Sequence, residues 1–179
     1  MADFSKAVAI TLKNEGGFAD RSATTGEVVN RGITLAFLRG IGRVQAAGKP
    51  MDWEIAYVKG LTISDTTTLY RTYFWNPLGL DGMMTQAVAN AVFDFGVNTG
   101  LEEAVVVLQR ALGDIVPLGT VAVDGKLGPI TMRAVNNADP KALLAAFLVH
   151  GTNFYNVAEP AADRPVWIAR LDKMTAVTV

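Results

Sequence analysis

Residues 12–20 read LKNEGGFAD, and this stretch predicts a helix that ends on a carboxylate followed by two glycines. Side chains upstream recur at the spacing that places them on one helical face. That face contains Phe4, Val8, Thr11, Leu12 and Glu15. Gly16 supplies a stop at the C-terminal end of the helix. We therefore expect Glu15 at the end of a partly buried face, with open space beside the two glycines.

The rest of the chain predicts a mainly α fold of the α+β kind, a helical bundle with a small β-hairpin near residues 18–34. The hairpin segment is polar and turn-rich with short alternating pieces, whereas helical spacing dominates elsewhere. The first two of the later helices are predicted at 34–47 and from a cap at Ser64 or Asp65 through Trp75, with a break at Pro77. The others are predicted at 85–99, closed by Gly100, at 101–113, at 129–137 with Pro129 in the first turn, at 140–157 after a cap at Asp139, and at 166–174.

The composition favours a folded protein without metal or nucleic-acid chemistry. Of the 179 residues, 50% are hydrophobic and 18% are charged, which suits one compact domain or two small packed halves. The net charge of −1 and the isoelectric point of 5.8 provide no basic face for nucleic acid. The chain has no cysteine and one histidine, His150, whereas zinc sites usually need two or three such ligands. We expect no metal, no cofactor and a packed His150.

The apolar runs of the chain predict a protein that does not insert into membranes. The N-terminal residues lack the basic start and the continuous apolar run of a secretory signal. The longest apolar stretch, Ala142–Val149, is too short to span a bilayer. If the protein acts outside the cytoplasm, we expect another factor to release it.

Glu15 is suited to general acid catalysis. Partial removal from water and the negative end of the helix dipole both disfavour its anion, and a protonated carboxyl can give its proton to a glycosidic oxygen. A second carboxylate would activate water or stabilise an oxocarbenium ion. Asp20 and Glu27 are the candidates, and Asn30 and Thr34 could hold a water. The alternatives are a Glu15 that pairs with a nearby arginine, and solvated loop residues at the other positions.

A further set of polar side chains lies on one predicted helix. Asn90, Asp94 and Asn98 recur every four residues among alanine, valine and phenylalanine, so they either face solvent or line a groove. Sugar sites use amides and carboxylates for hydroxyl groups and aromatic faces for rings. Tyr73 and Trp75 lie just upstream. These five residues are candidates for substrate binding, with a solvated stripe and core aromatics as the alternatives.

Several motifs, in order, resemble glycoside hydrolase family 108, the N-acetylmuramidases with a Glu-Gly-Gly-aromatic motif. NEGGFAD followed by TGEVVNRGIT is similar to the start of the family, and LYRTYFWNPL and AVFDFGVNTG are similar to its next two blocks. LQRALG, VDGKLGP and TMRAVN resemble the peptidoglycan-binding region that accompanies it, and FYNVAEPAADRPVWIARLDKM fits its ending. The resemblance predicts a catalytic region at 1–96 and a peptidoglycan-binding region at 97–179, packed as one body.

The resemblance implies a lysozyme-like fold and hydrolysis of the β-1,4 bond between N-acetylmuramic acid and N-acetylglucosamine in bacterial peptidoglycan. It maps the catalytic glutamate onto Glu15 and the aromatic position onto Phe18, where tyrosine is more familiar. It does not identify the second carboxylate, because RSATTGEVV replaces a loop that is often rich in Asp, Pro and Gly. Asp20 or Glu27 is favoured over Asp94.

The leading hypothesis is a muramidase that acts as a phage endolysin. We expect such a protein to be a monomer that stays in the host cytoplasm until it is released to the periplasm or cell wall. A bacterial muramidase that aids secretion would use the same chemistry. A non-catalytic peptidoglycan-binding protein and a chitinase-like hydrolase are the alternatives from other classes.

The segment VDGKLGPITMRAVN has two interpretations. Asp124-Gly125 makes a tight turn and Pro129 starts a helix, which is a sufficient structural explanation. The same segment could contact a glycan or peptide stem and extend the binding groove.

Overall fold

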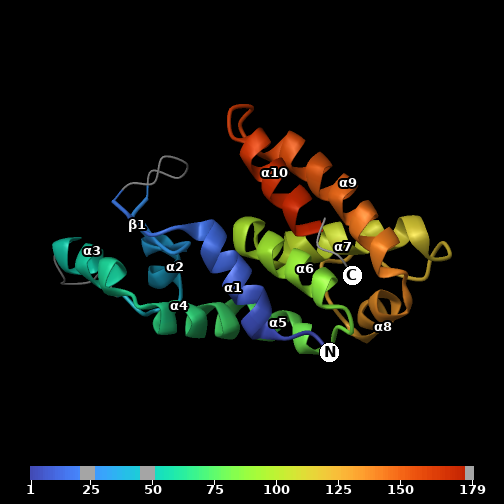
Figure 1. Cartoon of the computed structure of the whole chain (residues 1–179), viewed down its shortest axis with the longest axis horizontal. Helices are drawn as coiled ribbons and strands as arrows, with labels where there is room; N and C mark the ends of the chain where they lie inside the picture. The colour runs from blue at the N-terminus through green and yellow to red at the C-terminus, as the bar shows by residue number, and fades with distance from the viewer. Residues whose placement is uncertain (21–26, 45–50, 176–179) are drawn as a thin grey trace. The chain divides into compact units, whose positions relative to one another are not determined.

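The computed structural model describes residues 1–20, 27–44 and 51–175 and shows a mainly helical protein with one small antiparallel sheet (Figure 1). The chain forms two compact units. The smaller unit is Val8–Tyr70, and the larger unit combines Met1–Ala7 with Arg71–Val179. The predicted mainly α fold with a small β element is confirmed.

Helix α1 (Phe4–Glu15) begins in the larger unit and ends in the smaller one. Its first turn is anchored by Phe4, whose ring packs edge-on against Trp75 and Phe93, with centroids 5.4 Å and 5.9 Å away. The predicted apolar face is buried at its first three positions and half-buried at Glu15. The helix therefore ends with its carboxyl at the margin of the protein interior.

The predicted hairpin is present and has a third strand. β1 (Phe18–Ala19), β2 (Val29–Asn30) and β3 (Ile33–Thr34) pair antiparallel in that order. A two-residue turn joins β2 to β3, and both of its residues have positive φ, 50° at Arg31 and 77° at Gly32. Positive φ at both central positions is typical of the turn that matches strand twist in tight hairpins.

Three helices complete the smaller unit: α2 (Leu35–Gly40), α3 (Met51–Gly60) and α4 (Ile63–Tyr70). The helix predicted for 34–47 is shorter than expected, because the chain turns at Ile41, and residues 45–47 lie outside the described residues. The cap predicted at Ser64 or Asp65 is at Thr62 instead. Thr62 Oγ1 accepts from the Asp65 amide at 3.1 Å, and Asp65 Oδ2 accepts from the Thr62 amide at 2.9 Å, a reciprocal capping box.

The larger unit continues the chain through a π-helical turn, η1 (Arg71–Trp75), then α5 (Asn76–Leu78) and η2 (Leu80–Gly82). Pro77 lies inside α5, and the break comes at Gly79, which adopts a left-handed conformation. The remaining helices are α6 (Gln86–Thr99), α7 (Leu101–Ile115), α8 (Pro129–Asn137), α9 (Pro140–Ala158) and α10 (Arg164–Thr175).

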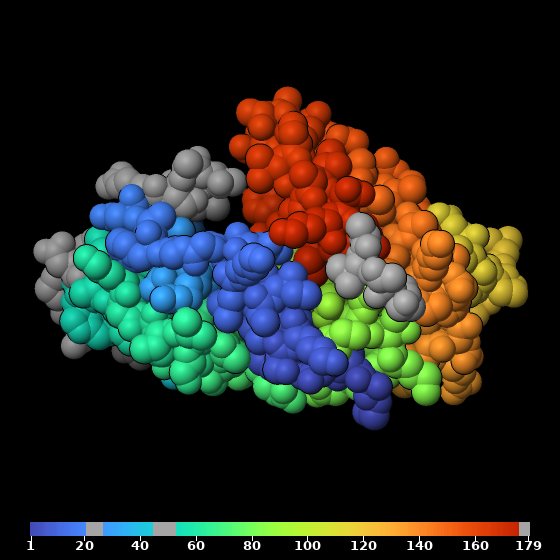
Figure 2. All heavy atoms as spheres, in the orientation of Figure 1, coloured from blue at the N-terminus to red at the C-terminus, as the bar shows by residue number. Residues whose placement is uncertain are grey.

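Four of these helices, α6, α7, α9 and α10, pack against one another, and α8 packs against α7. The atoms of α9 and α10 lie side by side at the orange and red end of the colour scale in Figure 2. Gly113, predicted to end α7, lies inside its last turn because its φ is not positive. In the described ranges, no helix combines the length and apolar character needed to cross a bilayer.

Candidate active site

Glu15 is the last residue of α1, and its side chain is half-buried. The helix stops here because Gly16 has a φ of 70°, in the left-handed region that glycine enters without strain. A Cβ on Gly16 or Gly17 would meet no neighbouring atom within 4 Å. The open space predicted at the two glycines is present, directly after the carboxyl in the chain.

The turn between β2 and β3 lies against the Glu15 carboxyl. A Cβ on Gly32 would lie 2.5 Å from Glu15 Oε2 and 2.7 Å from Glu15 Cδ, and it would also overlap the hydroxyl oxygen of Tyr70. Only a residue without a side chain leaves room for both groups. Gly32 therefore lets a carboxyl from α1 and a hydroxyl from the end of α4 approach the same point.

Hydrogen bonds from three side chains fix this turn. Tyr70 Oη donates to the Arg31 carbonyl at 2.8 Å. Arg31 Nη1 donates to the Leu61 carbonyl at 2.8 Å and to Asn30 Oδ1 at 3.0 Å. The buried Asn30 amide donates to three carbonyl oxygens at and just after the end of α3, at 2.9, 3.1 and 3.3 Å. The turn is thereby tied to α3, to α4 and to the segment between them.

The two candidates for the second carboxylate flank the same end of the β1–β2 pair. Asp20 follows β1 directly and is exposed, whereas Glu27 precedes β2 and is half-buried. A hydrogen bond to Glu54 and, more weakly, the charge of Glu27 raise the pKa of Arg39. Residues 21–26, which join the two candidates, lie outside the described residues.

Phe18 and Thr34 also belong to the small sheet. Phe18 is half-buried in β1, and Lys59 Nζ lies 5.7 Å from the centroid of its ring. Thr34 is the N-cap of α2, where its Oγ1 accepts from the Phe37 amide at 3.0 Å. Because the cap uses only an oxygen lone pair, the Thr34 hydroxyl keeps its hydrogen for another partner.

A pocket of about 360 Å³ lies elsewhere in the smaller unit. Its wall includes Leu61, whose carbonyl accepts from the turn, and Arg43 and Asp65 bring opposite charges to it. Hydrogen bonds from Thr62, aided by the Arg43 charge, lower the pKa of Asp65. The pocket thus carries an anionic carboxylate at neutral pH.

The predicted aromatic contacts lie in the larger unit. Tyr73 is half-buried in η1. Trp75 is fully buried, its Nε1 donates to Asp81 Oδ1 at 2.8 Å, and its ring packs edge-on against Phe4 and Phe93. These contacts give Trp75 a place in the core of the larger unit, and its role in substrate binding stays a prediction.

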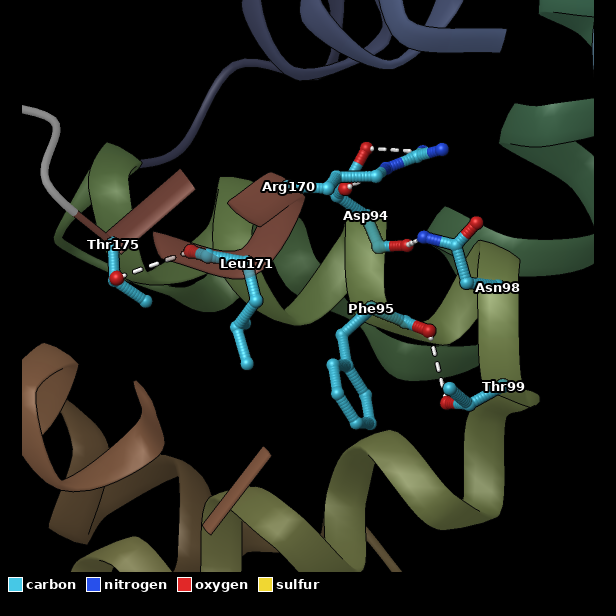
Figure 3. A network of polar contacts seen from close by, with 7 residues as sticks. All are labelled: Asp94, Phe95, Asn98, Thr99, Arg170, Leu171 and Thr175. Atoms are coloured by element: carbon cyan, nitrogen blue, oxygen red, sulfur yellow. Dashed lines mark hydrogen bonds and ion pairs between the residues drawn. The ribbon is translucent and has the colours of Figure 1, made fainter. Parts of the chain in front are cut away.

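The polar stripe of α6 is used inside the larger unit (Figure 3). Asp94 is 2% exposed, and Arg170 of α10 binds both of its oxygens, with Nε 2.7 Å from Oδ2 and Nη2 2.8 Å from Oδ1. Asn98 Nδ2 donates to the Asp94 carbonyl at 2.7 Å, and Asn90 Oδ1 accepts from Gln86 at 2.7 Å. The Asp94–Arg170 contact joins α6 to α10, and the other two lie within α6. Sugar binding by the stripe stays a prediction.

His150 has the packed position expected for it. Its side chain in α9 is 23% exposed, and Nε2 lies 2.8 Å from Asp114 Oδ2 of α7. Among the residues that the structure describes, no group of three or more His, Cys, Asp and Glu side chains could hold a metal ion.

The VDGKLGP segment forms the expected turn into a helix. Gly125 has a φ of 71°, and Pro129 is the first residue of α8. Gln109 of α7, 1% exposed, fixes the turn by donating to Asp124 Oδ1 at 2.8 Å and accepting from the Asp124 and Gly125 amides at 3.0 Å and 2.9 Å. A pocket of about 530 Å³ beside it includes Glu102 and Lys126. Contact with a glycan or peptide stem stays a prediction.

Sequence reasoning missed the roles of Gly32 and Tyr70. The NRGI stretch carries a local signal for Gly32, because an arginine-glycine pair between two short strand pieces suits a two-residue turn. Tyr70 has no local signal, since its hydrogen-bond partner Arg31 is 39 residues away. Only the packing of α4 against the turn brings them together.

Comparison with known proteins places the chain among wall-degrading enzymes. A family model described as glycosyl hydrolase 108 matches residues 8–100, and one described as predicted peptidoglycan domain matches residues 103–169. A solved structure of Brucella abortus SagA is similar with a TM-score of 0.79 and 26% identity, over 97% of this chain and 91% of that chain. No curated protein matches the sequence. The order of the two family matches and the mainly α, lysozyme-like fold agree with expectation.

Proposed function

The chain belongs to the glycosyl hydrolase 108 family and is a glycoside hydrolase of peptidoglycan, and we propose that it cleaves the β-1,4 bond between N-acetylmuramic acid and N-acetylglucosamine with Glu15 as general acid. The observation that carries the proposal is the place of Glu15. Its half-buried carboxyl lies against a side-chain-free turn at Gly32, and two glycines with open space follow it.

In this mechanism Glu15 gives its proton to the glycosidic oxygen as the bond from C1 to that oxygen breaks. The electron pair of the bond leaves with the oxygen, and positive charge develops on C1 and the ring oxygen. A second carboxylate either activates the attacking water or forms a covalent intermediate that water then hydrolyses. Asp20 and Glu27 are the two candidates, and both flank residues 21–26.

Substrate contacts are proposed on the same sheet. The partly exposed Phe18 ring offers an apolar face to a sugar ring, and the Thr34 hydroxyl has a hydrogen to donate. Tyr73 and Asn98 are further proposed contacts from the larger unit. We also propose that residues 1–96 carry the catalysis and residues 97–179 the binding of peptidoglycan. The match of 103–169 to the peptidoglycan domain supports this division.

The first test compares wild type with Glu15→Gln on purified peptidoglycan, with the released fragments identified by mass spectrometry. Muropeptides with new muramic acid reducing ends are expected from the wild type only. A loss of about 100-fold or more is expected from removal of a positioned acid. Glu103→Gln, on the exposed surface of α7, is the matched control and should keep full activity.

Equal cleavage by wild type and Glu15→Gln would remove Glu15 from the mechanism. Binding without cleavage by the wild type would favour the non-catalytic alternative. The variants Asp20→Asn and Glu27→Gln test which residue is the second carboxylate. The anomer that forms first, observed by NMR, shows whether the configuration at C1 is retained or inverted.

For the biological setting we propose host-cell lysis by a phage endolysin, on the basis of the family resemblance. Cells that express the protein in the cytoplasm should lyse when their inner membrane is permeabilised. Cells that express Glu15→Gln should remain intact under the same treatment. Survival of both cultures would exclude a lytic role.

A further inference from the structure

The hydroxyl of Tyr70 has two neighbours that lie far apart in the sequence. The Tyr70 side chain is fully buried, and its hydrogen is committed to the Arg31 carbonyl at 2.8 Å. The hydroxyl oxygen also lies close to the position where Gly32 would carry a Cβ, and the Glu15 carboxyl lies close to the same position. A hydroxyl and a carboxyl are therefore neighbours across a residue that has no side chain.

The turn that Tyr70 holds is a strained one. Arg31 is the one non-glycine residue with positive φ in the described ranges, at 50°. A left-handed conformation is strained for such a residue, and it persists only where surrounding contacts determine it. Here the contacts are the Tyr70 hydroxyl on the carbonyl of Arg31 and two acceptors on its guanidinium.

The backbone is irregular on the Tyr70 side as well. Helix α4 ends at Tyr70, and the chain passes directly into the π-helical turn Arg71–Trp75. Single π-helical turns occur frequently at functional sites, because the extra residue per turn re-aims a side chain. Tyr70 thus lies at the last position before the helix changes its period.

We propose that Tyr70 is a positioning residue for Glu15, an inference that rests on the proposed function. Its hydroxyl fixes the Arg31–Gly32 turn against the Glu15 carboxyl and limits the positions from which that carboxyl can deliver its proton. Because the hydroxyl hydrogen is used by Arg31, the oxygen presents lone pairs to its surroundings.

The test uses two substrates that differ in their need for an acid. In peptidoglycan the leaving group is a sugar hydroxyl, a poor leaving group that needs a proton. In an aryl β-glycoside of a peptidoglycan oligosaccharide, the aryl group leaves as a stable phenolate and needs no proton. Tyr70→Phe removes the hydroxyl and keeps the buried ring. On peptidoglycan, kcat should fall about tenfold, part of the roughly 10²–10⁴-fold that a positioned acid contributes, with KM unchanged. On the aryl glycoside, kcat should stay at the wild-type value.

Two variants calibrate the result. Glu15→Gln should show the same substrate selectivity with a larger loss on peptidoglycan. Tyr155→Phe removes the hydroxyl of another buried tyrosine, in the larger unit, and should leave both substrates unaffected. Thermal unfolding checks that each variant is folded.

Equal losses on both substrates, or no loss on either, would overturn the role of Tyr70 while leaving Glu15 in place. Failure of the wild type on peptidoglycan would instead overturn the proposed function and the inference with it. If Tyr70→Phe does not fold, Gly32→Ala supplies the second test. It keeps the hydroxyl but places a methyl group between it and the carboxyl, and it should show the same selective loss.

Discussion

At the scale of single residues, Gly32 is expected to be the least replaceable of the described glycines of the smaller unit. In Gly32→Ala the new methyl group would overlap Glu15 and Tyr70 while the backbone keeps a φ of 77°. Gly119→Ala is the matched control, because Gly119 has a φ of 82° and nothing within 4 Å of its Cβ position. The control should lose about 1–2 kcal/mol of stability from backbone strain.

Gly32→Ala should lose more stability than the control and about tenfold of its activity on peptidoglycan, since its neighbours must move apart. Thermal unfolding followed by circular dichroism measures the first effect, and release of muropeptides measures the second. Equal shifts of Tm in the two variants, with activity intact in both, would show that the site tolerates a side chain at this point.

How far the sequence predicts a residue's role depends on the distance to its partners along the chain. The position of Glu15 follows from one helical face and one glycine stop, all within 12 residues of α1. Asp94 shows the opposite case, because its partner Arg170 lies 76 residues away and nothing local announces the pair. A polar stripe at helical spacing looks the same in a sequence whether it faces solvent or a buried arginine.

At the scale of elements, Gln109 joins α7 to the turn that precedes α8. In Gln109→Ala two backbone amides of the turn lose their acceptor, and Asp124 Oδ1 loses one of its two donors, the other being the Lys126 amide. Net losses of about 1 kcal/mol per hydrogen bond predict a fall of roughly 2–4 kcal/mol in the free energy of unfolding, measured by urea denaturation. Arg110→Ala, on the exposed side of the same helix, should change it little.

The same turn makes the free energy of unfolding depend on pH, and Gln109→Ala should weaken this dependence. Hydrogen bonds from Gln109 and from the Lys126 amide lower the pKa of Asp124 below 3.8. A lowered carboxyl pKa contributes stability that is present above pH 3.8 and is lost as the pH falls through the folded-state pKa. The difference between wild type and variant should therefore shrink below pH 3.8, and a constant difference would contradict the assignment.

The ends of helices that carry a clear capping residue agree with prediction. Gly100 closes α6 with a φ of 100°, and Asp139 caps α9 by accepting from the Ala142 amide at 2.7 Å. Helix α3 was missed, because its only described buried side chains are Glu54 and Val58, too few for a clear apolar face. The π-helical turn after Tyr70 was missed too, since the pattern of the sequence does not distinguish it from an α-helix.

At the scale of the whole molecule, the compact units and the family regions divide the chain differently. The glycosyl hydrolase match covers residues 8–100, whereas the smaller unit ends at Tyr70. Helix α6 belongs to the matched hydrolase region, yet it packs on α7, α9 and α10 from the following region. A cut near residue 97 would therefore pass through one hydrophobic core. We propose that residues 71–100 of the hydrolase region fold together with the peptidoglycan region as parts of the larger unit.

The bond between Asp94 and Arg170 tests this picture, because it ties α6 to the last helix of the chain. Removing one partner of a buried ion pair leaves an unpaired charge and costs about 3–5 kcal/mol, whereas replacing both by apolar groups is often nearly neutral. Asp94→Leu alone should therefore lower the urea midpoint strongly, and Asp94→Leu combined with Arg170→Met should restore most of it. The activity of the double variant then separates two roles of Asp94. Full cleavage of peptidoglycan assigns Asp94 to the core alone, whereas a stable but inactive double variant would place it in substrate binding.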